Sequence, residues 1–223
     1  MSEKLKGTLL SRNPTEKQID LKNNLSIKDL GHFALAAETS LATNTLIGFD
    51  GSKIEKTQDF KETSFIAGRA TILEGAVIDG MTHISSSKID KFSESKIPDY
   101  SGKFGRGTYF ALGKVNGETV TGLQQSLANG DSFSHDTKAS GKFLMFSRED
   151  IKLVEKKLKE SIGDSPPNSS LKTNIKNANI MDLASRYDSE ISGIIVFMDN
   201  EKAGAEVVIS PKFTENIEIQ SVN

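Results

Sequence analysis

The stretch from Gly102 to Ala111 contains residue types that could bring a backbone close to a ligand. Three glycines fall within six positions, and the aromatic pair Tyr109 and Phe110 follows them. Glycine adopts positive φ without steric cost, so the stretch predicts a tight turn that presents Tyr109 or Phe110 from a fixed backbone. The alternative is an ordinary β-turn whose aromatic side chains enter the core, and the stretch by itself favours that alternative.

Two further residues could do chemistry, and each has a plain structural alternative. Glu206 opens an apolar strand soon after a glycine, although a carboxylate at a strand end is usually solvated. His83 closes an apolar run, a position that suits a hydrogen-bonded core histidine equally well. The chain has no cysteine, which excludes disulfides, a thiol nucleophile and cysteine-bound zinc. Its three histidines are far apart in sequence, so we expect no histidine-based metal site.

Apolar patterns and turn residues indicate which elements position these side chains. Helix-start signals predict helices over 14–23 and from Ser26 to Leu41, and polar composition predicts a loop over 48–63. Runs rich in β-branched and aromatic residues predict strands over 64–73, 77–84, 108–111, 142–146, 191–198, 205–210 and 217–222. Further helices or helical turns are predicted over 118–128, 148–161 and 180–187.

Length and composition favour one folded domain with an extension. The chain has 223 residues, a net charge of −2 and a mean hydropathy of −0.36. The small net charge argues against a dominant electrostatic attraction to nucleic acid. No apolar run approaches the length of a membrane span, and the N-terminus lacks the apolar core of a secretory signal. We therefore expect a cytoplasmic protein without membrane contact, or a secreted effector delivered without a cleavable signal.

Taken together, three segments resemble the ADP-ribosyltransferases, in the histidine–tyrosine–glutamate branch that includes diphtheria toxin and the poly(ADP-ribose) polymerases. These are His-Ile-Ser at 83–85, Gly-Arg-Gly-Thr-Tyr-Phe-Ala at 105–111 and Ala-Glu-Val-Val-Ile at 205–209. In that family a His-Gly-Thr/Ser motif ends the first core strand, a Gly-x-Gly-x-Tyr-Phe segment follows, and a late strand opens with the catalytic glutamate. The resemblance covers 64–222 and implies an α+β fold of two small packed β-sheets flanked by helices.

The resemblance implies that NAD is the co-substrate and that its nicotinamide–ribose bond is cleaved. Tyr109 would stack on the cationic nicotinamide ring. Glu206 would bind the 2′-hydroxyl of the adjacent ribose and hold it more tightly as positive charge develops on that ribose. His83 would hydrogen-bond the other ribose and so position the dinucleotide.

Neighbouring residues would complete the pocket in the same comparison. The backbone at Ile84 would hold the nicotinamide amide, Ser85 would support the bend, and Gly107 would shape the backbone beside the ring. Many family members place a second stacking aromatic on the helix that follows the first, and this chain has none in the corresponding region. The candidates to replace it are Phe110, Tyr100 and Phe133.

Two positions depart from the family pattern. Ile84 stands where the family has glycine, which keeps a backbone contact but moves one wall of the pocket. Gly204 stands two positions before Glu206, where arginine-modifying members carry an acidic or amide residue. The resemblance therefore implies an acceptor other than arginine. For the same reason it disfavours the arginine–serine–glutamate branch, onto which Arg69 and residues 85–87 could be placed.

The sequence thus favours a NAD-dependent mono-ADP-ribosyltransferase that modifies a macromolecule, either protein or nucleic acid, as a toxin or effector would. One alternative is a NAD glycohydrolase, which passes the ribosyl group to water. Another is a catalytically silent member of the same fold that binds a nucleotide or a partner protein. We expect a helical extension over 1–60 and a catalytic domain over 61–223, and the oligomeric state stays open.

Overall fold

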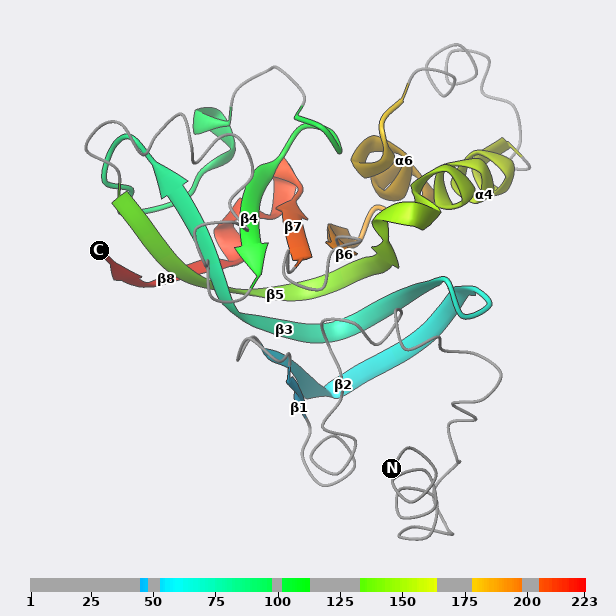
Figure 1. Ribbon diagram of the computed structural model, residues 1–223, viewed down its shortest axis with the longest axis horizontal. Coiled ribbons are helices and arrows are strands. Elements are labelled where there is room, and N and C mark those ends of the chain that lie inside the picture. The colour runs from blue at the N-terminus through cyan, green and yellow to red at the C-terminus, as the bar shows by residue number, and fades with distance from the viewer. Residues whose placement is uncertain (1–44, 48–52, 98–101, 113–132, 164–177, 198–204) are drawn as a thin grey trace, which may run out of the picture.

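The computed structural model describes residues 45–47, 53–97, 102–112, 133–163, 178–197 and 205–223. They form a mixed α+β fold that consists mostly of strands (Figure 1). The strands are β1 (Thr45–Ile47), β2 (Lys53–Ile66), β3 (Ala70–Ser85), β4 (Thr108–Leu112), β5 (Phe133–Ser147), β6 (Ile191–Phe197), β7 (Ala205–Ile209) and β8 (Ile217–Val222). The helices are α4 (Ile151–Gly163) and α6 (Ile180–Tyr187), with 3₁₀ turns η1 (Glu94–Lys96), η2 (Arg148–Asp150) and η3 (Pro211–Asn216).

The described strands form a single hydrogen-bonded sheet in the order β1-β2-β3-β4-β7-β6-β5-β8. β3 also pairs with β5, so that β3, β4, β7, β6 and β5 form a closed ring. All pairings are antiparallel except the one between β5 and β6. The sequence led us to expect two separate sheets. The strands are instead continuous because β3 and β5 are long and bulged, and each changes partners along its length.

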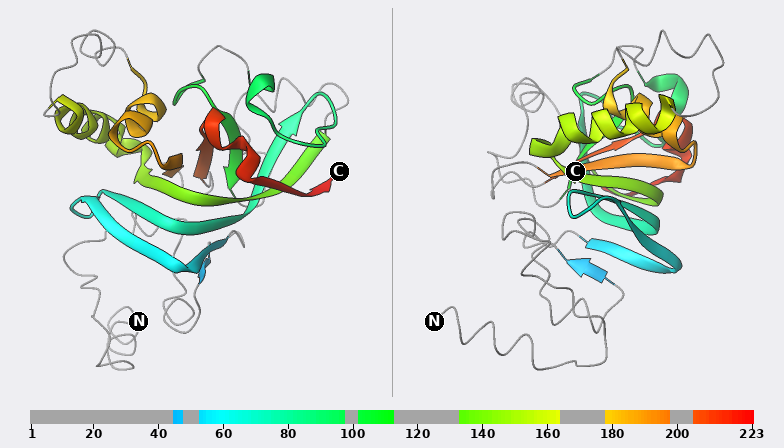
Figure 2. Two further views of the ribbon diagram at one scale, coloured as in Figure 1. Left: turned by 180° about the vertical axis from the view of Figure 1, so that it is seen from behind. Right: turned by 90° about the vertical axis from the view of Figure 1, so that its right-hand side faces the viewer.

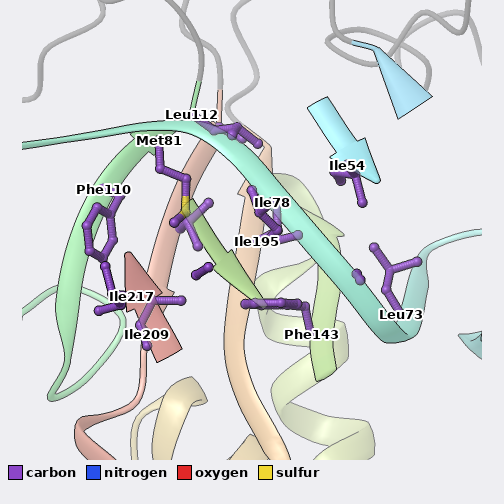
Figure 3. Packing of buried hydrophobic residues seen from close by; sticks show 14 of the residues in the cluster. Ile54, Leu73, Ile78, Met81, Phe110, Leu112, Phe143, Ile195, Ile209 and Ile217 are labelled. Atoms are coloured by element: carbon purple, nitrogen blue, oxygen red, sulfur yellow. The ribbon is translucent and has the colours of Figure 1, made fainter. Parts of the chain in front are cut away.

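One hydrophobic core includes a side chain from every strand of the ring. In Figure 3 these side chains project toward one another from β3, β4, β5, β6 and β7. Its buried members include Leu73, Ile78, Met81, Phe110, Leu112, Phe143, Ile195, Val207 and Ile209. Because successive side chains on a strand point to opposite faces, the residues between these face outward from the ring.

A second core lies on the outer face of β5, β6 and β7, beneath α4 and α6. Figures 1 and 2 show both helices on the same side of the strands. Each helix is preceded by a polar cap: Ser147 Oγ accepts a hydrogen bond from Glu149 N at 3.3 Å, and Asn179 Oδ1 accepts one from Asp182 N at 3.0 Å. Buried residues of this core include Leu144, Phe146, Val154, Leu158, Leu183, Ile194, Val196 and Val208.

Most of the predicted elements that fall on described residues are confirmed. They are the strands predicted over 77–84, 108–111, 142–146, 191–198, 205–210 and 217–222 and the helices predicted over 148–161 and 180–187, with small shifts at their ends. The predicted helices over 14–23, Ser26 to Leu41 and 118–128, and the candidate aromatic Tyr100, lie outside the described residues.

Two element predictions are wrong. The predicted loop over 48–63 contains most of β2, which pairs with β3. The predicted strand over 64–73 is interrupted by the turn that joins β2 to β3, where Gly68 adopts a φ of 67°. The proposed domain boundary after residue 60 falls within β2, and the division into two domains stays a prediction. Among the described helices, none is both long and apolar enough to span a membrane.

Candidate active site

The strands that carry the three sequence motifs are neighbours in the sheet. His83 lies near the end of β3, Tyr109 lies in β4, and Glu206 lies in β7. β4 lies between β3 and β7, although β5 and β6 separate β4 from β7 in the sequence. The topology therefore places the three motif backbones side by side.

Tyr109 and Glu206 lie on the same face of the sheet. In the pairing of β4 with β7, Ala111 is opposite Glu206 and Tyr109 is opposite Val208. Opposed residues share a face, and so do residues two apart on one strand. Val208 belongs to the core beneath α4 and α6, so this shared face is the outer one. Glu206 lies one step beyond Val208 on that face, between Ala111 of β4 and Val196 of β6.

The carboxylate of Glu206 is partly withdrawn from water, and one of its oxygens has no hydrogen-bond partner among the described residues. Its Oε2 atom is shielded from solvent, and no group among the described residues hydrogen-bonds to it. Burial raises the pKa of Glu206 above its ordinary value, and the positive charges of Lys103 and Arg148 oppose that rise. Such an oxygen can accept a hydrogen bond from a substrate hydroxyl.

The hydroxyl of Tyr109 is held by the glycine-rich turn. It donates a hydrogen bond to Gly105 O at 2.7 Å and accepts one from Phe104 N at 3.0 Å. The Tyr109 ring stacks on the Phe104 ring with centroids 6.5 Å apart. Burial raises the pKa of Tyr109, and the negative charge of Glu206 adds to that rise against the two hydrogen bonds. These contacts fix the ring of Tyr109, which is a rigid aromatic surface near Glu206.

Two glycines allow the turn to approach its neighbours closely. Gly105 has a φ of 130°, and an added Cβ would lie 2.8 Å from Met181 Cβ at the start of α6. An added Cβ on Gly107 would lie 2.5 Å from Ile209 O and 2.8 Å from Val208 Cγ1 on β7. The glycines therefore set the distance from the turn to α6 and to β7, the strand of Glu206.

His83 hydrogen-bonds the backbone of Tyr109, but its ring lies on the inner side of β4, opposite to the ring of Tyr109. Its Nδ1 lies 2.8 Å from Tyr109 O, and its ring centroid lies 5.3 Å from that of Phe92 and 5.5 Å from that of Phe110. Burial lowers the pKa of His83, and His135 lowers it further, against the hydrogen bond to Tyr109. The imidazole is therefore neutral at pH 7. Because a carbonyl only accepts, Nδ1 carries the proton and Nε2 is left as an acceptor.

The structure thus brings two of the three predicted catalytic side chains onto one face, and the third onto the opposite face. Phe110 alternates with Tyr109 along β4 and is buried in the inner core. That placement does not favour the predicted role of Phe110 as the second stacking aromatic. Ile84 is half-buried, and Ser85 Oγ donates a hydrogen bond to Ser87 O at 2.5 Å, which stabilises the bend after β3. The roles of both residues at NAD stay predictions.

Three residues near the motifs were not singled out from the sequence. Lys103 and Arg148 act on the charge of Glu206, and His135 hydrogen-bonds the segment after His83. Lys103 is adjacent to the glycine-rich motif, which is a signal for its position. Arg148 follows β5, and the pairing of β5 with β6 brings it near Glu206. The sequence alone does not predict this pairing.

The burial of Glu206 leads to a prediction about stability. Because its pKa is raised on folding, the folded state binds the proton more tightly than the unfolded state, and stability is lost as pH rises through that window. Glu206→Gln removes this penalty. We expect the variant to have a higher Tm than wild type, with a difference that grows from near pH 4.5, the ordinary value, and levels off above the raised pKa.

Thermal unfolding followed by circular dichroism over a pH series measures this difference. Glu218→Gln, which changes an exposed carboxylate on β8, is the matched control and is expected to show no comparable gain. A Glu206→Gln variant that is less stable than wild type at pH 7 would contradict the burial penalty.

The described part of the chain contains no cluster of three or more histidine, aspartate or glutamate side chains that could hold a metal ion. Comparisons with protein-family models, with curated proteins and with solved structures found no match. A functional proposal for this chain therefore depends on its motifs and on the geometry of the site.

Proposed function

We propose that the protein is a NAD-dependent mono-ADP-ribosyltransferase of the histidine–tyrosine–glutamate type, with a macromolecular acceptor other than arginine. One observation carries the proposal: the solvent-shielded Oε2 of Glu206 has no hydrogen-bond partner among the described residues, and it lies on the same face as the fixed ring of Tyr109. A solvent-shielded carboxylate oxygen without a partner among the described residues is costly for a fold, which supports a ligand group that would hydrogen-bond to it.

Glu206 has the chemistry that cleavage of NAD requires. As the bond between ribose C1′ and the nicotinamide nitrogen breaks, its electron pair moves to the ring, which becomes neutral, and positive charge develops on the ribose. An ionised carboxylate that accepts a hydrogen bond from the 2′-hydroxyl stabilises this charge, most strongly where water is excluded. The acceptor then attacks C1′ and loses a proton.

Tyr109 acts through its ring rather than through its hydroxyl. The hydroxyl is occupied by Gly105 O and Phe104 N, so it is not available to transfer a proton. The electron-rich face of a fixed aromatic ring attracts a cationic pyridinium and loses that attraction once nicotinamide becomes neutral. This arrangement suits a surface that binds the nicotinamide end of NAD.

His83 is suited to positioning a different part of the dinucleotide. Its ring lies across β4 from the ring of Tyr109 and packs against Phe92 and Phe110, so its role at the second ribose comes from the family resemblance. A neutral imidazole whose Nε2 accepts a ribose hydroxyl contributes orientation without donating a proton. The adjacency of β3, β4 and β7 supports extending the proposal to an ADP-ribosyltransferase-like fold.

Incubation of the protein with a cell lysate and NAD labelled on its adenylate phosphate tests the proposal. We expect the label to become attached to a macromolecule, and to be released by either protease or nuclease, which identifies the acceptor class. Free ADP-ribose as the only product would instead indicate a NAD glycohydrolase. If no nicotinamide is released at high protein concentration, both the transferase and the glycohydrolase hypotheses are contradicted. That result would favour a catalytically inactive binding protein.

A further inference from the structure

His135 is a fully buried polar residue that the proposed reaction does not use. It lies on β5 directly opposite His83 of β3 in the pairing of these strands, and none of its surface is exposed. Its ring centroid lies 6.2 Å from that of His83 and 6.4 Å from that of Phe92. Burying an imidazole in such a place is unfavourable unless both nitrogens are hydrogen-bonded.

Both nitrogens of His135 face the backbone of one segment, 83–89. Nε2 accepts a hydrogen bond from Ile89 N at 2.9 Å, and Nδ1 lies 3.4 Å from His83 O. A single neutral tautomer satisfies both contacts, with the proton on Nδ1 and a bare Nε2. His135 therefore joins the first and last residues of the segment in which the chain leaves β3 and turns.

We infer that His135 is a positioning residue for the dinucleotide site. The segment that it fixes contains the backbone of Ile84 and the hydroxyl of Ser85, and it begins at His83, the proposed ribose contact. His135 touches neither the outer face nor Glu206, so it acts on binding through the shape of this segment. The inference rests on the proposed function, because it assigns the segment to the binding of NAD.

The inference is tested by measuring steady-state nicotinamide release by two variants of His135. His135→Leu removes both hydrogen bonds, and we expect KM for NAD to rise about tenfold while kcat changes little, since the reacting groups lie elsewhere. His135→Gln keeps an acceptor and a donor on one planar group, so it is expected to restore most of the lost affinity. Rescue by glutamine distinguishes positioning from simple filling of space.

Thr137→Val is the matched control. Thr137 is also fully buried on β5, and its Oγ1 donates a hydrogen bond to Met81 O at 3.0 Å, so it ties β5 to β3 two residues before His83. We expect Thr137→Val to lose about as much stability as His135→Leu does, while its KM for NAD stays at the wild-type value. An equal rise in KM for Thr137→Val would show that general loosening of β3, and not His135, controls binding.

Hydrogen exchange at the amide of Ile89 provides a readout that does not depend on catalysis. We expect protection of this amide to fall in His135→Leu and to be kept in His135→Gln. Unchanged protection in His135→Leu would overturn the inference whatever the enzyme does. Lack of nicotinamide release by the wild-type protein would overturn the proposed function, whereas normal release with an unchanged KM in His135→Leu would overturn the inference alone.

Discussion

Glu206→Gln is expected to lower kcat for nicotinamide release from NAD about 10²–10³-fold, as the loss of one preorganised transition-state contact does in other enzymes. Glutamine has nearly the same size and shape as glutamate, so the packing between Ala111 and Val196 is kept. In the proposed mechanism, the substitution removes the negative charge that stabilises the developing positive charge on the ribose. Because this charge matters most in the transition state, KM is expected to change far less than kcat.

The same variant is expected to be at least as stable as wild type at pH 7, which separates lost chemistry from lost folding. Glu218→Gln on β8 again serves as the control and is expected to keep wild-type kcat. Near-normal turnover by Glu206→Gln would remove Glu206 from the mechanism. A parallel loss of activity in Glu218→Gln would show that the effect is not specific to the site.

Gly107→Ala is expected to destabilise the protein by about 1–3 kcal/mol, the usual cost of forcing extra volume into a packed site. The new Cβ would lie 2.5 Å from Ile209 O, which is a backbone atom and cannot move aside as the end of a side chain can. Relief requires β4 and β7 to separate. Because these strands carry Tyr109 and Glu206, we also expect most of the activity to be lost.

Urea unfolding followed by circular dichroism measures the loss of stability of Gly107→Ala, and nicotinamide release measures the loss of activity. Gly163→Ala is the matched control, since an added Cβ at the end of α4 meets no atom of the described residues within 4 Å. It is expected to leave the unfolding midpoint and the activity close to wild type. Wild-type stability of Gly107→Ala would mean that the β4–β7 contact is looser than the structure describes.

The elements around the site were predictable because their local signals agree with their environment. β6 is apolar at nearly every position and is buried on both faces, so an apolar run was a sufficient sign. Ser147 caps the 3₁₀ turn η2 that leads into α4, and the buried Val154 and Leu158 of α4 follow helical spacing. Tyr109 and Glu206 could be placed at the start of a strand because each lies two positions after a glycine and opens an apolar run.

Other features could not be predicted because tertiary pairing overrides composition. Residues 53–66 are polar and charged along much of β2, and they form a strand because β3 provides hydrogen-bond partners for it. The first part of β5 alternates inward and outward, but two of its inward positions are the polar His135 and Thr137, which hide the pattern. The side chains of His83 and Tyr109 lie on opposite faces of the sheet because of the register between β3 and β4. Neither strand specifies this register by itself.

The pairing of β4 with β7 has a consequence for when activity can appear in a newly made chain. Thr108 is opposite Ile209, so the two strands that hold Tyr109 and Glu206 meet only after about a hundred intervening residues have been synthesised. Closing so long a loop is entropically costly and slow, which makes this contact a late event in folding. A nascent chain that ends before β7 has its histidine and tyrosine motifs but lacks the carboxylate, so under the proposed function we expect it to be unable to cleave NAD.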